Sequence, residues 1–281
     1  IQGRVMEWVA LGVALFVVLL AGLGHMGYRK HMLQLKQWAR VLSEMPAVQP
    51  HQNLEDLPEP AQRLLRHAIS DDAKAVRGVS FKAVGEIRPA KDGEWLPCVA
   101  YQTLRVPGGF TWRCYVKSGL MRLSGGDHYL AGSGGVHFWL LGVFHAVKSK
   151  GRDVAKSAAH RALLEAMWLP PALLPSEHVE WLDGDNDTAR VKLKLDEEEL
   201  VVEYKIDSDG RIVSVKGERW GDQNDEHEWQ PMTFGGVMEA EQTVQGYTVP
   251  SKFRVGWHFG NDEWQDGEFY RAELQDIQFI E

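Results

Sequence analysis

The N-terminal part of the chain is dominated by one long apolar run. No ionisable side chain occurs from Trp8 to Gly24 (WVALGVALFVVLLAGLG), and the apolar character continues to Tyr28 with only His25 interrupting it. A helix rises about 1.5 Å per residue, so roughly 20 such residues cross the ~30 Å hydrocarbon core of a bilayer. Residues 1–28 are therefore predicted to form a single transmembrane helix that contacts the membrane through residues 8–28. A cleaved signal peptide and a buried helix of a soluble core are the alternatives.

The pattern changes after this run. Residues 29–56 are polar and contain Pro46 and Pro50, so they are predicted to be a juxtamembrane linker. A short amphipathic stretch within them is able to continue the anchor helix; its apolar residues are Met32, Leu35, Trp38 and Leu42. The remainder, residues 57–281, is interpreted as one domain.

Helical periodicity occurs twice in this domain. In residues 57–69, apolar residues fall at helical spacing after Pro60 and predict a short helix with one buried stripe. In residues 153–169, a second helix presents one face of small and apolar residues, and Pro170 and Pro171 end it. That face consists of Ala155, Ala159, Ala162, Leu163, Ala166 and Met167.

Most of the domain alternates between apolar and polar residues with a period of two, as strands do. The clearest examples are residues 200–207 and 253–259, and Asp209-Gly210 is a typical two-residue hairpin turn. About ten or more strands with short connections predict an α+β fold: a large curved antiparallel sheet, or half-barrel, packed on one or two helices. The concave face of such a sheet must be filled.

Charge is unevenly distributed along the chain. The net charge is -8, but residues 1–50 carry five Lys or Arg against two Asp or Glu, so the remainder is more acidic than the whole. An acidic domain does not attract phosphate backbones, which argues against nucleic acid as a partner. Four basic residues follow the apolar run and one precedes it, which by the positive-inside rule places the domain in the cytoplasm. The predicted location is the cell (inner) membrane, with a single pass.

Several segments resemble a family of bacterial proteins known only as a domain of unknown function. The resemblance covers residues 57–281 and is carried by LPEPAQRLLRHAI (57–69), PGGFTWRCYV (107–116), EAMWLPPALLP (165–175) and VPSKFRVGWH (249–258). A weaker, fold-level similarity is to the lipoprotein-localisation-factor and mycobacterial lipoprotein group, in which a curved sheet wraps around helices and holds acyl chains. This chain differs from that group by its apolar N-terminal run and by having no lipid-attachment cysteine. The similarity implies a hydrophobic pocket and a periplasmic or extracellular domain.

The candidate ligand-binding residues are found where the second helix meets the family motif. We expect the site to include Trp112, Tyr129, Leu163, Glu165, Met167 and Trp168. Glu165 has two interpretations: an ion pair with Arg161 four residues earlier, or a carboxyl at the mouth of an apolar cavity that meets a ligand's polar head. The tryptophans have two as well, because aromatic side chains form ordinary cores as readily as ligand pockets.

The sequence contains no strong catalytic or metal-binding motif. Ser133 lies in a Gly-rich stretch that imitates a nucleophile elbow, but Ala131 replaces the first glycine of that motif. The cysteines and histidines lack zinc-binding spacing, so no metal and no cofactor is predicted. Cys98 and Cys114 lie on adjacent predicted strands, and their redox state is left open.

Three functional hypotheses follow. The favoured one is a membrane-tethered, non-enzymatic protein that binds a lipid or another apolar ligand in the concave face of the sheet. The second is a membrane-associated hydrolase that uses Ser133 or a carboxylate such as Glu165 or Asp127. The third is an accessory protein that binds another membrane protein through a sheet edge.

Overall fold

A single antiparallel sheet of 13 strands forms the body of the protein. The computed structural model describes residues 2–281, with the side chains of residues 11–281. The strand order is β6-β5-β4-β3-β2-β1-β13-β12-β11-β10-β9-β8-β7. The strands are β1 Gly78–Ile87, β2 Leu96–Arg105, β3 Gly109–Ser118, β4 Met121–Leu130, β5 Ser133–Leu140, β6 Phe144–Lys150, β7 Val179–Leu182, β8 Thr188–Leu195, β9 Glu198–Ile206, β10 Ile212–Gly221, β11 Gln230–Val244, β12 Tyr247–Trp257 and β13 Glu268–Ile280.

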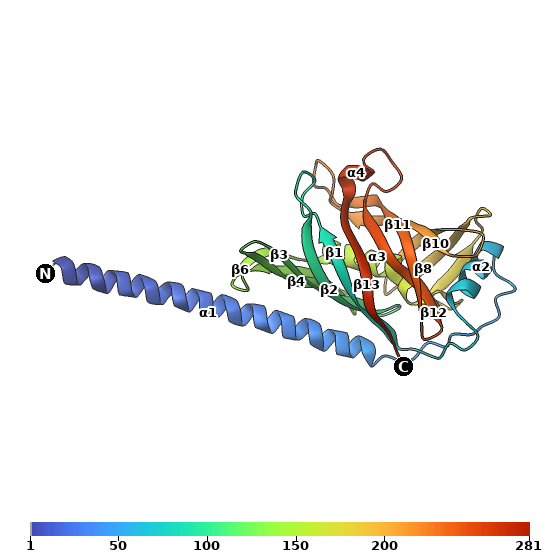
Figure 1. The fold of residues 1–281 in the computed structure, drawn as a ribbon, viewed down its shortest axis with the longest axis horizontal. Helices are drawn as coiled ribbons and strands as arrows, with labels where there is room; N and C mark the ends of the chain where they lie inside the picture. Colours follow the sequence, from blue (N-terminus) through green and yellow to red (C-terminus); the bar gives the residue numbers. More distant parts are fainter. Residues whose placement is uncertain (1) are drawn as a thin grey trace.

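Two meanders make up this sheet, and its last strand joins them. Strands β1 to β6 and β7 to β12 each pair with their sequence neighbours, and β13 lies between β1 and β12. The sheet curls into a half-barrel, and β13 (red) stands in the middle of it, at the front of the view in Figure 1. Its buried face follows the alternation of the sequence: in β9 the side chains of Leu200, Val202, Tyr204 and Ile206 are all buried. The predicted α+β fold, with its curved antiparallel sheet and apolar N-terminal helix, is confirmed.

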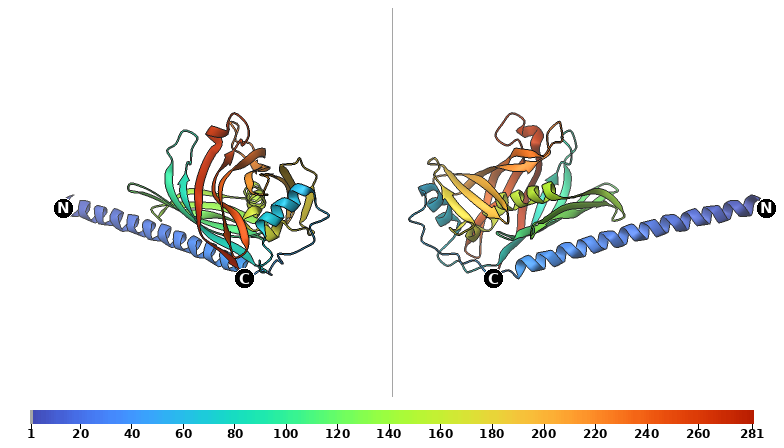
Figure 2. Two further views of the ribbon diagram at one scale, coloured as in Figure 1. Left: turned by 45° about the vertical axis from the view of Figure 1, so that its right-hand side comes forward. Right: turned by 180° about the vertical axis from the view of Figure 1, so that it is seen from behind.

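The concave face is filled by one helical segment. Helix α3 (Arg152–Leu164) and the short 3-10 helices η1 (Glu165–Trp168) and η2 (Pro170–Leu173) run through the half-barrel (Figure 2). Ala159 and Ala162 are completely buried. A Cβ atom on Gly134 of β5 would lie 2.7 Å from Cα of Ala155, so glycine is needed there for α3 to approach the sheet. Helix α2 (Glu59–Ala68) contacts β8, β12 and η2, and α4 (Trp264–Gly267) lies between β12 and β13.

The N-terminal apolar run and the amphipathic stretch after it form one helix, α1 (Gln2–Ser43). Its described part contains one segment, starting at Leu11, that is long and apolar enough to cross a membrane and is not buried in the protein. Farther along, Leu35 and Leu42 are completely buried, and α1 contacts β2, β3 and β4. Within the stretch expected as a linker, residues 29–43 are therefore helical and packed on the sheet.

Aromatic and histidine side chains form much of the contact between α1 and the sheet. Trp38 lies against His128 of β4, with their ring centroids 4.0 Å apart, and His31 lies 4.9 Å from His137 of β5. Nε2 of His137 lies 2.7 Å from Nδ1 of His145 on the neighbouring strand β6. Burial lowers the pKa of both His128 and His137 to about 4.

Acid is expected to weaken this contact. In the unfolded chain a histidine has a pKa near 6.5, so between pH 6.5 and 4 the unfolded state binds more protons than the folded state. The free energy of unfolding should therefore fall on acidification, on the order of 1–2 kcal/mol between pH 7 and 5. Urea unfolding at both pH values measures it. His128→Phe keeps a ring against Trp38 and should reduce the pH dependence; an unreduced dependence would contradict the role of His128.

Candidate functional site

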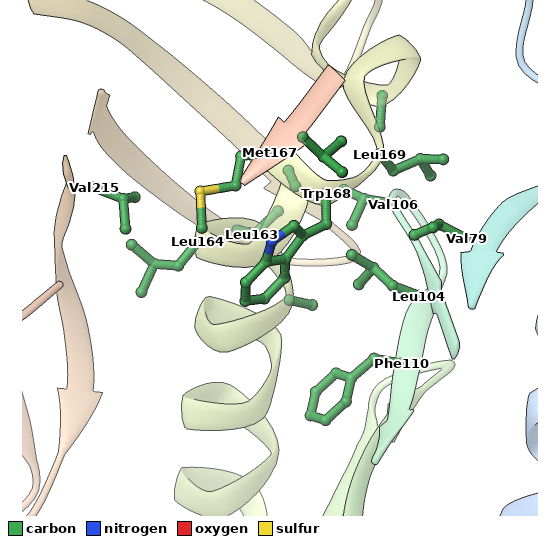
Figure 3. Close-up of a cluster of buried hydrophobic side chains, with 14 of the residues drawn as sticks. Val79, Leu104, Val106, Phe110, Leu163, Leu164, Met167, Trp168, Leu169 and Val215 are labelled. Atoms are coloured by element: carbon green, nitrogen blue, oxygen red, sulfur yellow. The ribbon is translucent and has the colours of Figure 1, made fainter. Parts of the chain in front are cut away.

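A partly enclosed cavity of about 180 Å³ lies between η1 and the concave face of the sheet. Figure 3 shows Leu164, Met167 and Val215 on one side of the helical segment, and Leu104 and Phe110 on the other. Most of the cavity wall is apolar or aromatic and is drawn from both meanders. The wall residues of this kind are Phe81, Ala83, Ile87, Trp112, Phe138, Leu164, Met167, Trp168, Val215, Phe234, Phe253, Val255, Phe269 and Tyr270.

Trp168 forms the centre of the aromatic wall. Its ring lies 5.4 Å from that of Phe81 and 5.1 Å from that of Phe253, measured between centroids. The indole Nε1 donates a hydrogen bond to the carbonyl oxygen of Pro250, at 3.0 Å. Because its polar atom is paired with the backbone, Trp168 offers the cavity only its apolar ring.

One corner of the cavity is polar and is built around Arg161. Its Nε donates to Oε1 of Glu165 at 2.8 Å, and its Nη1 donates to Oδ2 of Asp127. Gln102 completes the cluster, because its amide nitrogen donates to Oε2 of Glu165 at 2.6 Å. Burial alone would lower the pKa of Arg161, but the charges of Asp127 and Glu165 outweigh it and raise that pKa. Asp127 Oδ1 is buried and has no hydrogen-bond partner among the described residues.

Arg219 of β10 also lines the cavity, but it is not matched by a carboxylate. Its Nε donates to the carbonyl oxygen of Ser157 at 3.2 Å, and its guanidinium lies over the rings of Phe234 and Trp257. Among the described residues, no carboxylate oxygen lies within 4.0 Å of it, and its two terminal nitrogens donate no hydrogen bond. Burial, and then the like charge of Arg161, lower the pKa of Arg219 to about 10. It is still a cation at neutral pH.

This cation lies where the cavity meets a wider opening. An open hollow of about 850 Å³, the vestibule, is formed by the loops that follow β1, β10 and β12. Ile87, Arg219 and Phe269 line both the cavity and the vestibule, and we call these three residues the neck. A molecule that enters from the vestibule therefore passes Arg219 before it reaches the aromatic wall.

The structure brings together most of the residues selected from the sequence. Trp112, Glu165, Met167 and Trp168 line the cavity. Leu163 and Tyr129 do not: Leu163 is completely buried elsewhere in the core, and the Tyr129 hydroxyl donates to Oδ2 of Asp196 at 2.7 Å. Leu164, the next residue of the helix, faces the cavity in its place.

The ion-pair interpretation of Glu165 agrees with the structure, and its contact with a ligand's polar head stays a prediction. Glu165 forms the ion pair with Arg161 four residues earlier, and the same carboxylate lines the cavity. Sequence reasoning missed Gln102 and Arg219. Arg219 could have been found from the sequence. It alternates in β10 with the buried residues Val215 and Gly217, so it places a charge on the apolar face of that strand.

The groups considered for catalysis and metal binding do not come together as a catalytic or metal site requires. Ser133 is exposed, and among the described side chains it forms no hydrogen bond with a histidine. Asp127 and Glu165 are both bound by Arg161. In the part of the chain that the structure describes, no three His, Cys, Asp or Glu residues are placed to hold a metal ion. Cys98 and Cys114 are both free and buried.

Comparison with solved structures returns several chains of similar fold. A domain described as an outer membrane lipoprotein-sorting protein, from Vibrio parahaemolyticus, is 11% identical, with a TM-score of 0.41, over 81% of this chain and 93% of that one. A LolA superfamily protein from Nitrosomonas europaea is 8% identical, with a TM-score of 0.42, over 79% and 92% of the two chains. A DUF1329 family protein from Desulfovibrio piger is 8% identical, with a TM-score of 0.43, over 78% and 91%.

Comparison with protein families gives a match over most of the chain. No curated protein matches the sequence significantly. Residues 55–279 match a family of unknown function, DUF6920, and this range nearly coincides with the segment in which the sequence resembles such a family. The chain therefore belongs to this family of unknown function.

Proposed function

We propose that this protein is a membrane-anchored binding protein that holds an amphiphilic ligand, with the apolar part in the cavity and an acidic group at Arg219. The observation that carries the proposal is the meeting of a largely aromatic cavity with an arginine that no carboxylate of the described residues contacts, at its neck. Ligand pockets are typically lined by apolar and aromatic side chains with a few placed polar groups, and this cavity has that composition. The vestibule gives the remainder of a longer ligand room outside the neck.

The contacts of the two arginines point to Arg219 as the place for the acidic group. Arg161 contacts both Asp127 and Glu165, whose two negative charges exceed its one positive charge, so it offers a ligand no net positive charge. Arg219 has two terminal nitrogens without a protein partner, and a guanidinium binds carboxylate and phosphate groups with two parallel hydrogen bonds. A partly buried cation without a partner is costly, and an acidic ligand group removes that cost.

The anchor in this proposal is the apolar part of α1. Residues 8–28 span the inner membrane, and residues 57–281 form the binding domain. The basic residues that follow the span are Arg29, Lys30, Lys36 and Arg40, and they favour the cytoplasmic side. A hydrolase is not supported by the arrangement around Ser133, and no observation favours it over binding.

Arg219→Leu is expected to weaken binding of an acidic amphiphile selectively. Hydrogen bonds to charged groups contribute roughly 1.5–3 kcal/mol, so the Kd for dansylaminoundecanoic acid should rise about 10- to 100-fold. The Kd for its methyl ester, which has the same chain without the charge, should change little. Fluorescence titration of the detergent-solubilised full chain measures both. Equal losses for acid and ester would contradict the role of Arg219.

A further inference from the structure

The tips of two neighbouring hairpins expose large apolar side chains. Leu120, in the turn between β3 and β4, is 95% exposed, and Phe144, at the start of β6, is 61% exposed. Met121 and Leu141 are exposed beside them, and the amide of Leu141 donates to the carbonyl oxygen of Arg122, which joins the two tips. We call Leu120, Met121, Leu141 and Phe144 the hairpin-tip patch. Such a contiguous apolar surface marks a site of interaction.

This patch lies beside the point where the apolar run of α1 ends. The turn between β5 and β6 packs on α1 so closely that a Cβ atom on Gly24 would lie 2.2 Å from the carbonyl oxygen of Val143. Gly24 is also the last residue of the uncharged run. The hairpins point along α1 toward its N-terminal half (Figure 1). If that half spans a bilayer, the patch lies at the depth of the interface.

The surface around the patch is basic, although the chain as a whole is acidic. Residues 113–152 contain six Lys or Arg against one acidic residue, Asp127, which is bound by Arg161. Lys117 and Arg122 pair with each other across the β3–β4 hairpin beside Leu120; both are exposed, and among the described residues neither has an acidic partner within 4.0 Å. Each Lys or Arg near an anionic bilayer surface adds favourable electrostatic energy. Apolar tips within a basic border are the pattern of a membrane-surface contact.

A protein partner would use the same region differently. Strand β6 is an edge of the sheet, where a strand of a partner protein could be added. Charged side chains on an edge strand, lysines especially, oppose such pairing. Lys148 and Lys150 stand on this edge and oppose pairing. The apolar side chains are gathered at the tips, next to the end of the span, and not along the strand. The arrangement therefore fits a lipid surface better than an added strand.

We propose that the hairpin-tip patch docks on the anionic surface of the membrane that α1 crosses. Leu120, Met121, Leu141 and Phe144 enter the interface, and the surrounding lysines and arginines contact lipid phosphates. The inference rests on the anchoring of α1 in the proposed function but not on ligand binding. Docking holds the domain, and with it the neck of the cavity, at a fixed orientation to the bilayer.

Depth measurements on the full chain test this proposal. Single cysteines at Leu120→Cys and Phe144→Cys are labelled with an NBD fluorophore, while Cys98 and Cys114 are buried and the unsubstituted chain serves as the blank. Leu15→Cys reports insertion of α1, and Asp209→Cys, in the exposed turn between β9 and β10, reports a position in water. The chain is reconstituted in phosphatidylcholine vesicles with or without phosphatidylglycerol, and quenching by doxyl-labelled lipid gives the depth.

We expect the labels at 120 and 144 to reach the interface in phosphatidylglycerol vesicles while the label at 209 stays in water. Lys117→Glu combined with Arg122→Glu, the pair that flanks the turn with Leu120, should reduce the docked fraction at least about tenfold. If the label at 15 is inserted but those at 120 and 144 behave like the one at 209, docking is overturned and the anchor stands. If the label at 15 is not inserted, the anchor fails and this inference with it. Ligand titration in detergent is independent of both results.

Discussion

Replacing Arg161 by methionine is expected to lower the free energy of unfolding by about 3–5 kcal/mol, the cost of removing one partner from a buried ion pair. The substitution leaves the carboxylates of Asp127 and Glu165 buried without a cation, because both depend on this guanidinium. Its side chain is only 15% exposed, and theirs are 14% exposed, so water compensates the two charges only in part. Urea unfolding of the full chain in detergent, followed by tryptophan fluorescence, measures the change.

Arg40 provides a matched control for this prediction. It also pairs with a glutamate four residues later, Glu44, at the same 2.8 Å, but its side chain is 79% exposed. Arg40→Met should therefore leave the unfolding midpoint unchanged within error. Adding Asp127→Asn and Glu165→Gln to Arg161→Met should recover part of the lost stability, because the unmatched charges are removed. Equal effects of Arg161→Met and Arg40→Met would show that the polar corner is not a buried charge cluster.

The second large effect is expected from filling the cavity. Ala83 of β1 lines the cavity, so Ala83→Trp places an indole in the space assigned to the ligand. Burial of a large apolar side chain contributes roughly 1.5–3 kcal/mol, and the Kd for dansylaminoundecanoic acid should rise by at least about tenfold when that burial is lost. The methyl ester should lose affinity equally, which distinguishes this variant from Arg219→Leu.

Ala162→Trp is the control for cavity filling. Ala162 is completely buried but does not line the cavity, so its enlargement strains the packing between α3 and the sheet. We expect a loss of about 1–3 kcal/mol in stability and an unchanged Kd in the protein that remains folded. An Ala83→Trp variant that binds as tightly as the wild type would place the ligand elsewhere.

Local patterns were sufficient to predict the elements and the class of the fold. Strict alternation in residues 200–206 predicted β9, and the small residues of 153–169 predicted a helix close to the sheet. The position of β13 between β1 and β12 could not be predicted in this way. Pairing of the last strand with the first is a long-range contact, and no local periodicity encodes which strands become neighbours.

The site was predicted less completely than the fold, for a physical reason. Whether an aromatic residue such as Trp168 lines a cavity or fills a core depends on the volume that all its neighbours leave free. Those neighbours come from distant parts of the chain, so the local sequence does not reveal that volume. Tyr129 shares the inward parity of Asp127 on β4, but it lies farther along the strand, where Asp196 binds its hydroxyl. Arg219 could have been selected from the sequence, because it places a charge on the buried face of β10, and the proposed ligand class rests on it.

The presence of a ligand in the cavity is tested most directly by native mass spectrometry of the full chain, released from membranes in mild detergent, followed by solvent extraction. We expect the wild-type protein to carry an additional mass, extraction to identify it as an acidic amphiphile, and Ala83→Trp to lack it. A wild-type protein that carries no additional mass and binds neither dansylaminoundecanoic acid nor its methyl ester would contradict the proposed binding function.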